Sequence, residues 1–245
     1  MEKLTAIKTN TASQLKIKGF LENSLIDWDG KISAVIFISG CNFACPFCHN
    51  GVLVKQNNDI AEISQEKILA LLKAKRAWLD GVVISGGEPC MYLELFELMK
   101  EIKKMGFPIK IDTNGSHPKP LETLIKYGLV DYVAMDIKAP LNANYKKLSG
   151  SNINIDRIKR SIAVLRGSEI EYEFRTTFVP TMLEKNDLVE IASFLKGSKR
   201  FFIQQFKPKE AMAPELRELA PYSSKYLLET LQECRKFIPN SRLRD

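Results

Sequence analysis

The chain has 245 residues, 45% of them hydrophobic and 27% charged, a composition that excludes a disordered or fibrous protein. The longest apolar runs, at 34–38 and 81–84, are far shorter than the ~20 residues of a membrane-spanning helix, so we expect a cytosolic protein of one globular domain over residues 1–245. The net charge of +7 comes from scattered bases, which argues against nucleic-acid binding and suits an acidic protein partner.

Strands and helices are predicted to alternate along the chain. A β-branched apolar run predicts a strand at 32–39, and further short apolar runs predict strands at 82–85, 109–113, 132–137, 172–179 and 201–205. Apolar residues three or four positions apart predict helices between and after them, at 64–76, 92–105, 121–127, about 155–165, 187–195 and 225–237. Each parallel step needs a crossover, so the alternation predicts an α/β fold with a parallel sheet, either open or partly closed into a barrel.

A polar motif stands at the end of each predicted strand. These motifs occupy residues 41–50, 85–89, 112–115, 136–138, 175–177 and 204–205. In parallel α/β folds the carboxyl ends of the strands converge on one rim, where active sites are built. We therefore expect all six motifs to line one cavity.

Three of the five cysteines are crowded into the first motif, at Cys41, Cys45 and Cys48. An odd number of cysteines in this arrangement is a poor disulfide framework and favours reduced thiolates that hold a metal. Tetrahedral zinc and a fully protected cubane cluster both take four protein ligands. A fourth ligand is not obvious, since His49, Cys90 and Cys234 are each possible, and a structural metal site or free surface thiols are the plainer alternatives.

The segment Gly-Cys-Asn-Phe-Ala-Cys-Pro-Phe-Cys-His-Asn at 40–50 resembles the cluster loop of the radical S-adenosylmethionine (SAM) enzymes. In that family three cysteines, here Cys41, Cys45 and Cys48, hold a [4Fe–4S] cluster and leave one iron open for SAM. The resemblance implies reductive cleavage of SAM to a 5′-deoxyadenosyl radical. It also implies a partial (β/α)6 TIM-like barrel, with a core at about 19–205 and a helical extension at 206–245.

The same resemblance assigns cofactor-binding roles to residues of the later motifs. The Ser-Gly-Gly-Glu-Pro motif at 85–89 looks like the family's glycine-rich SAM motif. By the same resemblance, Lys138 would bind the SAM carboxylate, and a monovalent cation beside it would be held by Asp112, Thr113 and Asp136. Arg175 either touches SAM or forms a buried ion pair, Gln205 touches SAM or a partner peptide, and Cys90 and Cys234 are interpreted as small apolar residues. The expected cofactor-binding residues are Phe47, Gly86, Gly87, Glu88, Asp112, Thr113, Asp136, Lys138, Arg175 and Gln205.

The stretch at 19–35 looks like the lead-in of glycyl-radical activating enzymes, most of all those assigned to anaerobic ribonucleoside-triphosphate reductase. The resemblance implies that reductase as the partner and a flavodoxin or ferredoxin as electron donor. Three alternatives stay open. The chain could activate another glycyl-radical enzyme such as pyruvate formate-lyase, act on a small molecule as 7-carboxy-7-deazaguanine synthase does, or be a non-catalytic iron–sulfur or zinc module.

Overall fold

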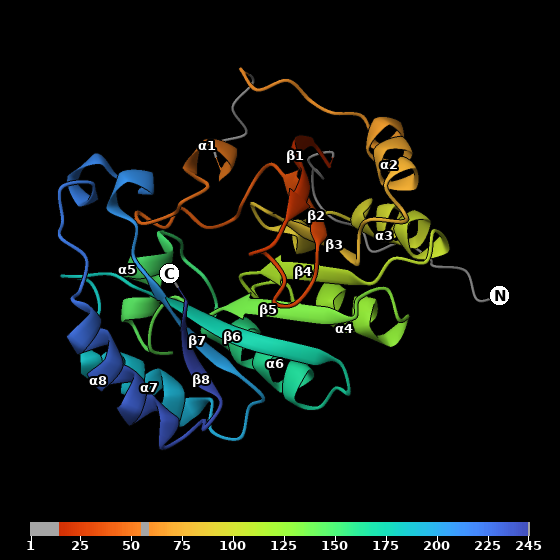
Figure 1. The fold of residues 1–245 in the computed structure, drawn as a ribbon. Helices are drawn as coiled ribbons and strands as arrows, with labels where there is room; N and C mark the ends of the chain where they lie inside the picture. Colours follow the sequence, from red (N-terminus) through yellow and green to blue (C-terminus); the bar gives the residue numbers. More distant parts are fainter. Residues whose placement is uncertain (1–14, 55–58, 245) are drawn as a thin grey trace.

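The structure is a computed structural model that describes residues 15–54 and 59–244. An eight-stranded sheet forms its centre, with the strands in sequence order from β1 to β8 (Figure 1). β1 runs antiparallel to β2, and all later neighbours are parallel. The strands are β1 (Ile17–Ser24), β2 (Ser33–Ile38), β3 (Gly81–Gly86), β4 (Ile109–Thr113), β5 (Tyr132–Asp136), β6 (Glu171–Phe178), β7 (Phe201–Gln205) and β8 (Ser241–Arg244).

The longer helices connect the parallel strands and lie outside the curved sheet (Figure 1). Right-handed crossovers between strands in sequence order place their helices on one side, and the sheet curves into a barrel whose free edges are β1 and β8. The α-helices are α1 (Gly51–Val54), α2 (Gln65–Ala74), α3 (Leu95–Lys104), α4 (Pro118–Lys126), α5 (Asn144–Ser149), α6 (Ile155–Arg166), α7 (Lys185–Phe194) and α8 (Ser224–Arg235), with 3₁₀ turns η1 (Pro89–Met91), η2 (Pro208–Glu210) and η3 (Pro214–Leu216).

The predicted α/β partial barrel is confirmed, and its six predicted strands correspond to β2 through β7. Both edge strands were missed. β1 contains Gly19 and is exposed at residues 21–23, and β8 has only four residues, two of which are arginines. Residues 206–245, expected to be helical, therefore also contribute a strand, which pairs with β7.

The two faces of the sheet are packed differently. The outer face carries the main apolar core against the helices, with residues such as Ile36, Ile84 and Phe174 fully buried. On the inner face, Trp28 from the β1–β2 turn joins Tyr132 in a small separate cluster. The buried side chains Lys110, Glu173 and Arg175 stand out beside it, so this face combines apolar packing with charge.

The open side of the barrel is bridged by an arginine from the last strand. Arg244 Nη1 donates to Glu173 Oε1 at 2.7 Å, and its Nη2 lies 3.2 Å from Asp29 in the β1–β2 turn. The two edges of the sheet are thus connected through side chains instead of backbone pairing. Within residues 15–54 and 59–244, every helix is too short or too polar to span a membrane.

Candidate active site

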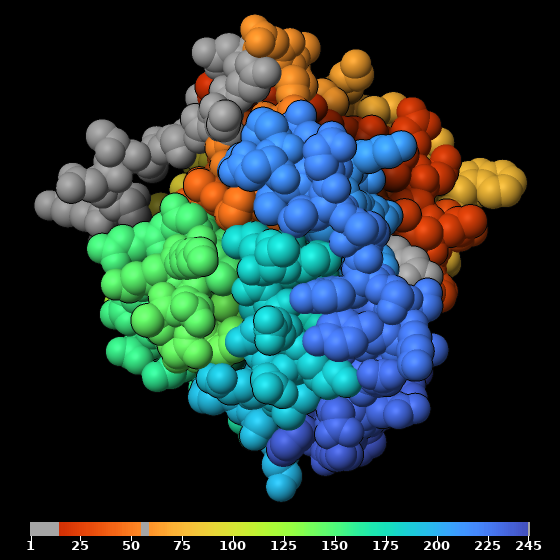
Figure 2. All heavy atoms as spheres, turned by 90° about the vertical axis from the view of Figure 1, so that its left-hand side faces the viewer, coloured from red at the N-terminus to blue at the C-terminus, as the bar shows by residue number. Residues whose placement is uncertain are grey.

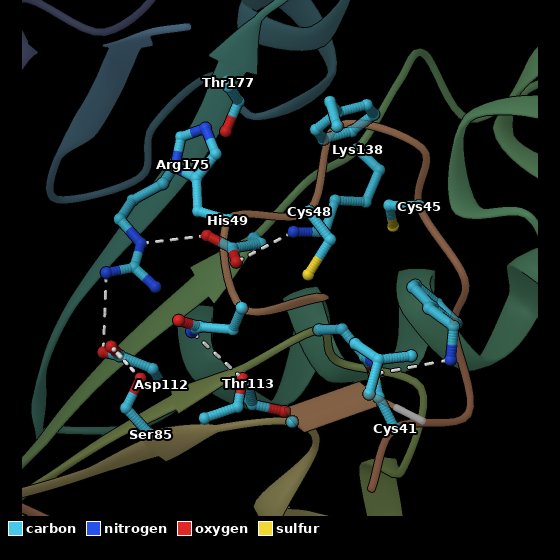
Figure 3. Close-up of a pocket in the computed structure, with 18 of the residues that line it drawn as sticks. Cys41, Cys45, Cys48, His49, Ser85, Asp112, Thr113, Lys138, Arg175 and Thr177 are labelled. Atoms are coloured by element: carbon cyan, nitrogen blue, oxygen red, sulfur yellow. Dashed lines mark hydrogen bonds and ion pairs between the residues drawn. The ribbon is translucent and has the colours of Figure 1, made fainter. Parts of the chain in front are cut away.

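A pocket of about 310 Å3 lies at the carboxyl ends of the parallel strands (Figure 3). All six polar motifs of the sequence reach it, because parallel strands direct their ends to the same rim. Three thiols form one wall, Arg175 and Asp112 lie away from them, and Lys138 lies beside Cys45 and Cys48. The predicted residues that line this pocket are Cys41, Cys45, Cys48, Phe47, Gly86, Gly87, Asp112, Thr113, Asp136, Lys138 and Arg175.

The cysteine loop follows β2 and is held from two sides. On one side Ala44 N donates to Ser149 O of α5 at 2.9 Å, and Gly150, with φ +62°, lies so close that a Cβ would meet Ala44 O at 2.2 Å. On the other side Ala213 N donates to Pro46 O at 2.8 Å. Figure 2 shows the blue segment near residue 210 beside the orange loop. The loop is therefore fixed in place by segments more than 100 residues away.

Burial raises the pKa of the three thiols, to about 12 for Cys41 and about 11 for Cys45. The negative charge of Glu88 adds to the rise at Cys41. Without a compensating cation these groups stay protonated at neutral pH, whereas a metal deprotonates its thiol ligands outright. The wall is therefore chemically suited to a metal centre that brings its own positive charge. In the described part of the chain, no three Cys, His, Asp or Glu side chains are grouped for a single metal ion.

The glycine-rich motif packs directly onto the start of the cysteine loop. Gly86 has φ +112°, and a Cβ on Gly87 would lie 1.9 Å from Gly40 O. Gly87 N donates to Ile38 O at 2.7 Å and Glu88 N to Gly40 O at 2.9 Å. Glycine is needed here because backbone meets backbone, and the contact leaves Gly86 and Gly87 at the pocket surface.

Glu88 does not line the pocket. It is completely buried, and its carboxylate accepts hydrogen bonds from Cys90 N at 3.0 Å, Thr113 Oγ1 at 2.7 Å and Asn114 N at 2.6 Å. Burial raises the pKa of Glu88, and the donated hydrogen bonds oppose that rise. In this structure the carboxylate connects the loop after β3 to the loop after β4.

A compact charge network extends across the pocket from Arg175 to Lys138, which lies beside Cys45 and Cys48 (Figure 3). Asp136 accepts from Arg175 Nε and from Lys138 Nζ, each at 2.9 Å. Burial alone would raise the pKa of Asp136, but the two cations outweigh it and lower the pKa to about 2. The same ion pairs raise the pKa of Lys138 and Arg175 against the opposing effect of burial. All three side chains are therefore charged at neutral pH.

Asp112 extends this network to β4. Ser85 Oγ donates to Asp112 Oδ2 at 3.0 Å, while Oδ1 lies 3.5 Å from Arg175 Nη1 and 3.6 Å from Lys110 Nζ. Within residues 15–54 and 59–244, no hydrogen-bond donor reaches this buried oxygen. Cationic side chains already balance both aspartates, so the described residues give no support for the expected monovalent cation.

Gln205 also lies outside the pocket. Its Nε2 donates to Tyr222 O at 2.8 Å, and Gln204 lines the pocket in its place. Side chains alternate across a strand, so two consecutive glutamines at the end of β7 face opposite ways. Cys90 and Cys234 are buried and do not line the pocket.

Several pocket residues were not predicted individually. Asn114, Thr177 and Gln204 lie inside motifs that were recognised, and the two-residue spacing from Asp112 and from Arg175 could have identified the first two as inward-facing. No pattern in the sequence points to Asp27 or Phe37 as pocket residues. Asp27 reaches the pocket from the β1–β2 turn, where no element was predicted.

Comparison with known proteins gives a consistent family. The sequence profile of the radical SAM superfamily matches residues 35–195. A Methanocaldococcus jannaschii protein, proposed to be a glycyl-radical enzyme activating enzyme, is 37% identical over 237 residues, covering 93% of this chain and 95% of that protein. The 7-carboxy-7-deazaguanine synthase of Buchnera aphidicola is 30% identical over 70% of this chain and 72% of its own length.

Among solved structures, SuiB of Streptococcus suis bound to S-adenosylmethionine resembles this fold with a TM-score of 0.67. The sequence identity is 16%, and the alignment covers 84% of this chain but only 48% of SuiB. The present chain thus spans about half of that protein, and the likeness concerns the fold.

Proposed function

This chain belongs to the radical SAM superfamily and is a homologue of glycyl-radical enzyme activating enzymes, and we propose that it generates a glycyl radical on a partner enzyme. The observation that carries the proposal is the pocket itself. Three thiols after β2 and a network of carboxylates and cations at the ends of β4, β5 and β6 meet in one cavity. Superfamily membership implies a [4Fe–4S] cluster and SAM as the groups that this cavity receives.

The residues present fit these groups. Cys41, Cys45 and Cys48 are the proposed cluster ligands, because one loop brings all three to the same cavity. Gly86 and Gly87 present backbone to the cavity without any side chain to exclude a ligand. When bound, the cluster and SAM together supply a 5′-deoxyadenosyl radical, which is the agent that removes a hydrogen atom from the substrate.

The chain's own charged residues hold and orient SAM in this proposal. Lys138 Nζ, which lies 6.0 Å from the centroid of the Phe47 ring, pairs with the SAM carboxylate, and Phe47 packs near the adenine. The ion pair of Arg175 and Asp136 sets the position of Lys138, and Asp112 holds Arg175 from the other side. The partner's glycine loses a Cα hydrogen atom to the radical, giving 5′-deoxyadenosine and a glycyl radical.

We infer that the partner is an anaerobic ribonucleoside-triphosphate reductase, on the resemblance of residues 19–35 to the lead-in of its activating proteins. A flavodoxin or ferredoxin is the proposed electron donor, and the net charge of +7 is compatible with such acidic proteins. A second candidate is small-molecule chemistry of the 7-carboxy-7-deazaguanine synthase type, which the Buchnera relative supports.

The test is anaerobic reconstitution with iron and sulfide, followed by reduction and SAM with and without the reductase of the same organism. We expect 5′-deoxyadenosine in both cases, a glycyl doublet in the electron paramagnetic resonance spectrum only with the reductase, and neither signal from Cys45→Ala. SAM cleavage without a doublet would contradict the reductase assignment. Turnover of a 6-carboxy pterin in that case would favour the small-molecule alternative.

A further inference from the structure

The side chain of Asn114, at the end of β4, approaches the sulfur of Cys41. Asn114 Nδ2 lies 3.7 Å from Cys41 Sγ and 3.0 Å from Asn42 Oδ1. The other end of the amide, Oδ1, accepts from Ser116 N at 2.9 Å and from Ser116 Oγ at 2.6 Å. Two donors therefore fix the position of the oxygen, and the NH2 group must face the sulfur.

The backbone of Asn114 is fixed as firmly as its side chain. Asn114 N donates to Glu88 Oε2 at 2.6 Å, and the neighbouring Thr113 hydroxyl donates to Glu88 Oε1 at 2.7 Å. Glu88 is inaccessible to solvent and Asn114 is only 6% exposed. The amide is thus presented to Cys41 by a buried carboxylate of the glycine-rich motif.

We propose that Asn114 raises the reduction potential of the cluster by donating a hydrogen bond to the Cys41 thiolate, and that Glu88 is the positioning residue for Asn114. This inference rests on the proposed function, since it takes Cys41 as a cluster ligand. Reduction adds negative charge to the cluster and its sulfur ligands, and a hydrogen bond to a charged acceptor strengthens as that charge grows. The amide therefore favours the reduced form, and hydrogen bonds to the sulfurs are one of the determinants of cluster potentials.

The proposed hydrogen bond joins one side-chain amide to one sulfur, so a second asparagine in the pocket provides a matched control. Asn50 has the same side chain in the same pocket, but its Nδ2 donates to Gly86 O at 3.3 Å instead of to a sulfur. Asn50→Ala and Asn114→Ala therefore remove the same group from one cavity. Both substitutions leave the backbone amides in place, including the bond from Asn114 N to Glu88.

The experiment is an anaerobic redox titration of the reconstituted protein without SAM or partner, followed by electron paramagnetic resonance, with iron and sulfide content measured for each variant. At a fixed potential we expect the ratio of reduced to oxidised cluster to fall by about threefold in Asn114→Ala, which is about 30 mV for a one-electron couple. Asn50→Ala should titrate as the wild type. Ser116→Ala, which removes one donor that orients the amide, should give a smaller fall in the same direction.

The outcomes separate this inference from the proposed function. An unchanged potential in Asn114→Ala, with full iron and sulfide content, overturns the inference and leaves the cluster assignment intact. Equal falls in Asn114→Ala and Asn50→Ala also overturn it, because the cause would then be the altered cavity. A wild-type protein that binds no cluster contradicts the proposed function itself.

Discussion

Removing the Glu88 carboxylate is expected to destabilise the protein even when no cofactor is present. In Glu88→Ala the donors Cys90 N, Thr113 Oγ1 and Asn114 N each lose an acceptor inside a region that solvent does not reach. An unsatisfied buried donor costs about 1–3 kcal/mol, so the three together cost about 3 kcal/mol or more. Relief of the buried charge, whose pKa is raised by burial, offsets part of that loss. A decrease of about 3 kcal/mol is large against a typical total stability of about 5–15 kcal/mol.

The assay is urea unfolding of the cluster-free protein under reducing conditions, because this separates a structural role from a cofactor contact. The matched control is Glu97→Ala on α3. The Glu97 carboxylate is 72% exposed and pairs with Lys100, so its loss should change the free energy of unfolding by less than about 0.5 kcal/mol. If Glu88 acted only on SAM, the cluster-free variant would unfold like the wild type. A change in Glu88→Ala no larger than the control would therefore refute the reasoning.

Two further expectations concern charge pairs around the inner face. Arg244→Ala leaves Glu173, which is 1% exposed, without its closest cation, and should lower the free energy of unfolding by about 2–3 kcal/mol. Asp29→Ala removes only the exposed partner of Arg244 and should lower the free energy of unfolding by less than about 1 kcal/mol. Equal losses in urea unfolding would contradict this ranking. The pKa of Asp136 is lowered to about 2, against about 3.9 in an unfolded chain, so its stabilising contribution is present above pH 4 and is lost as the pH falls toward 2. The difference in unfolding free energy between the wild type and Asp136→Asn should shrink over that range, and a difference independent of pH would refute it.

Much of the fold could be predicted from the sequence because its strands are buried on both faces. The strands β2 to β7 read as short, largely apolar segments between helical patterns, and such segments are recognisable without any alignment. The edge strands are different, since β1 is half exposed along its second half and β8 has the sequence Ser-Arg-Leu-Arg. Their pairing depends on a sheet that already exists, so local sequence carries little sign of it.

The position of the candidate site could be predicted from the sequence, but the direction of every side chain in it could not. The motifs at the strand ends identify the rim, and eleven of the predicted site residues lie in the pocket. Gln205 was assigned to the pocket because it ends a strand, although its neighbour Gln204 is the one that faces inward. Glu88 follows two pocket glycines, yet Gly86 adopts φ +112° and the chain turns before the carboxylate is reached. Strand ends locate a residue along the barrel axis, while the local backbone decides which way it points.

The contacts around Glu88 also explain why three separate motifs behave as one unit. The loop after β2 holds the thiols, the loop after β3 packs its glycines on Gly40, and the loop after β4 is fastened to both through Glu88 and Asn114. Because buried thiolates need a positive centre, loading a cluster onto Cys41 would stabilise the same loops that Glu88 holds together. Cluster binding and the stability of this rim are therefore coupled, and a substitution at Glu88 should weaken cluster retention through the loops, without the carboxylate ever contacting the cluster.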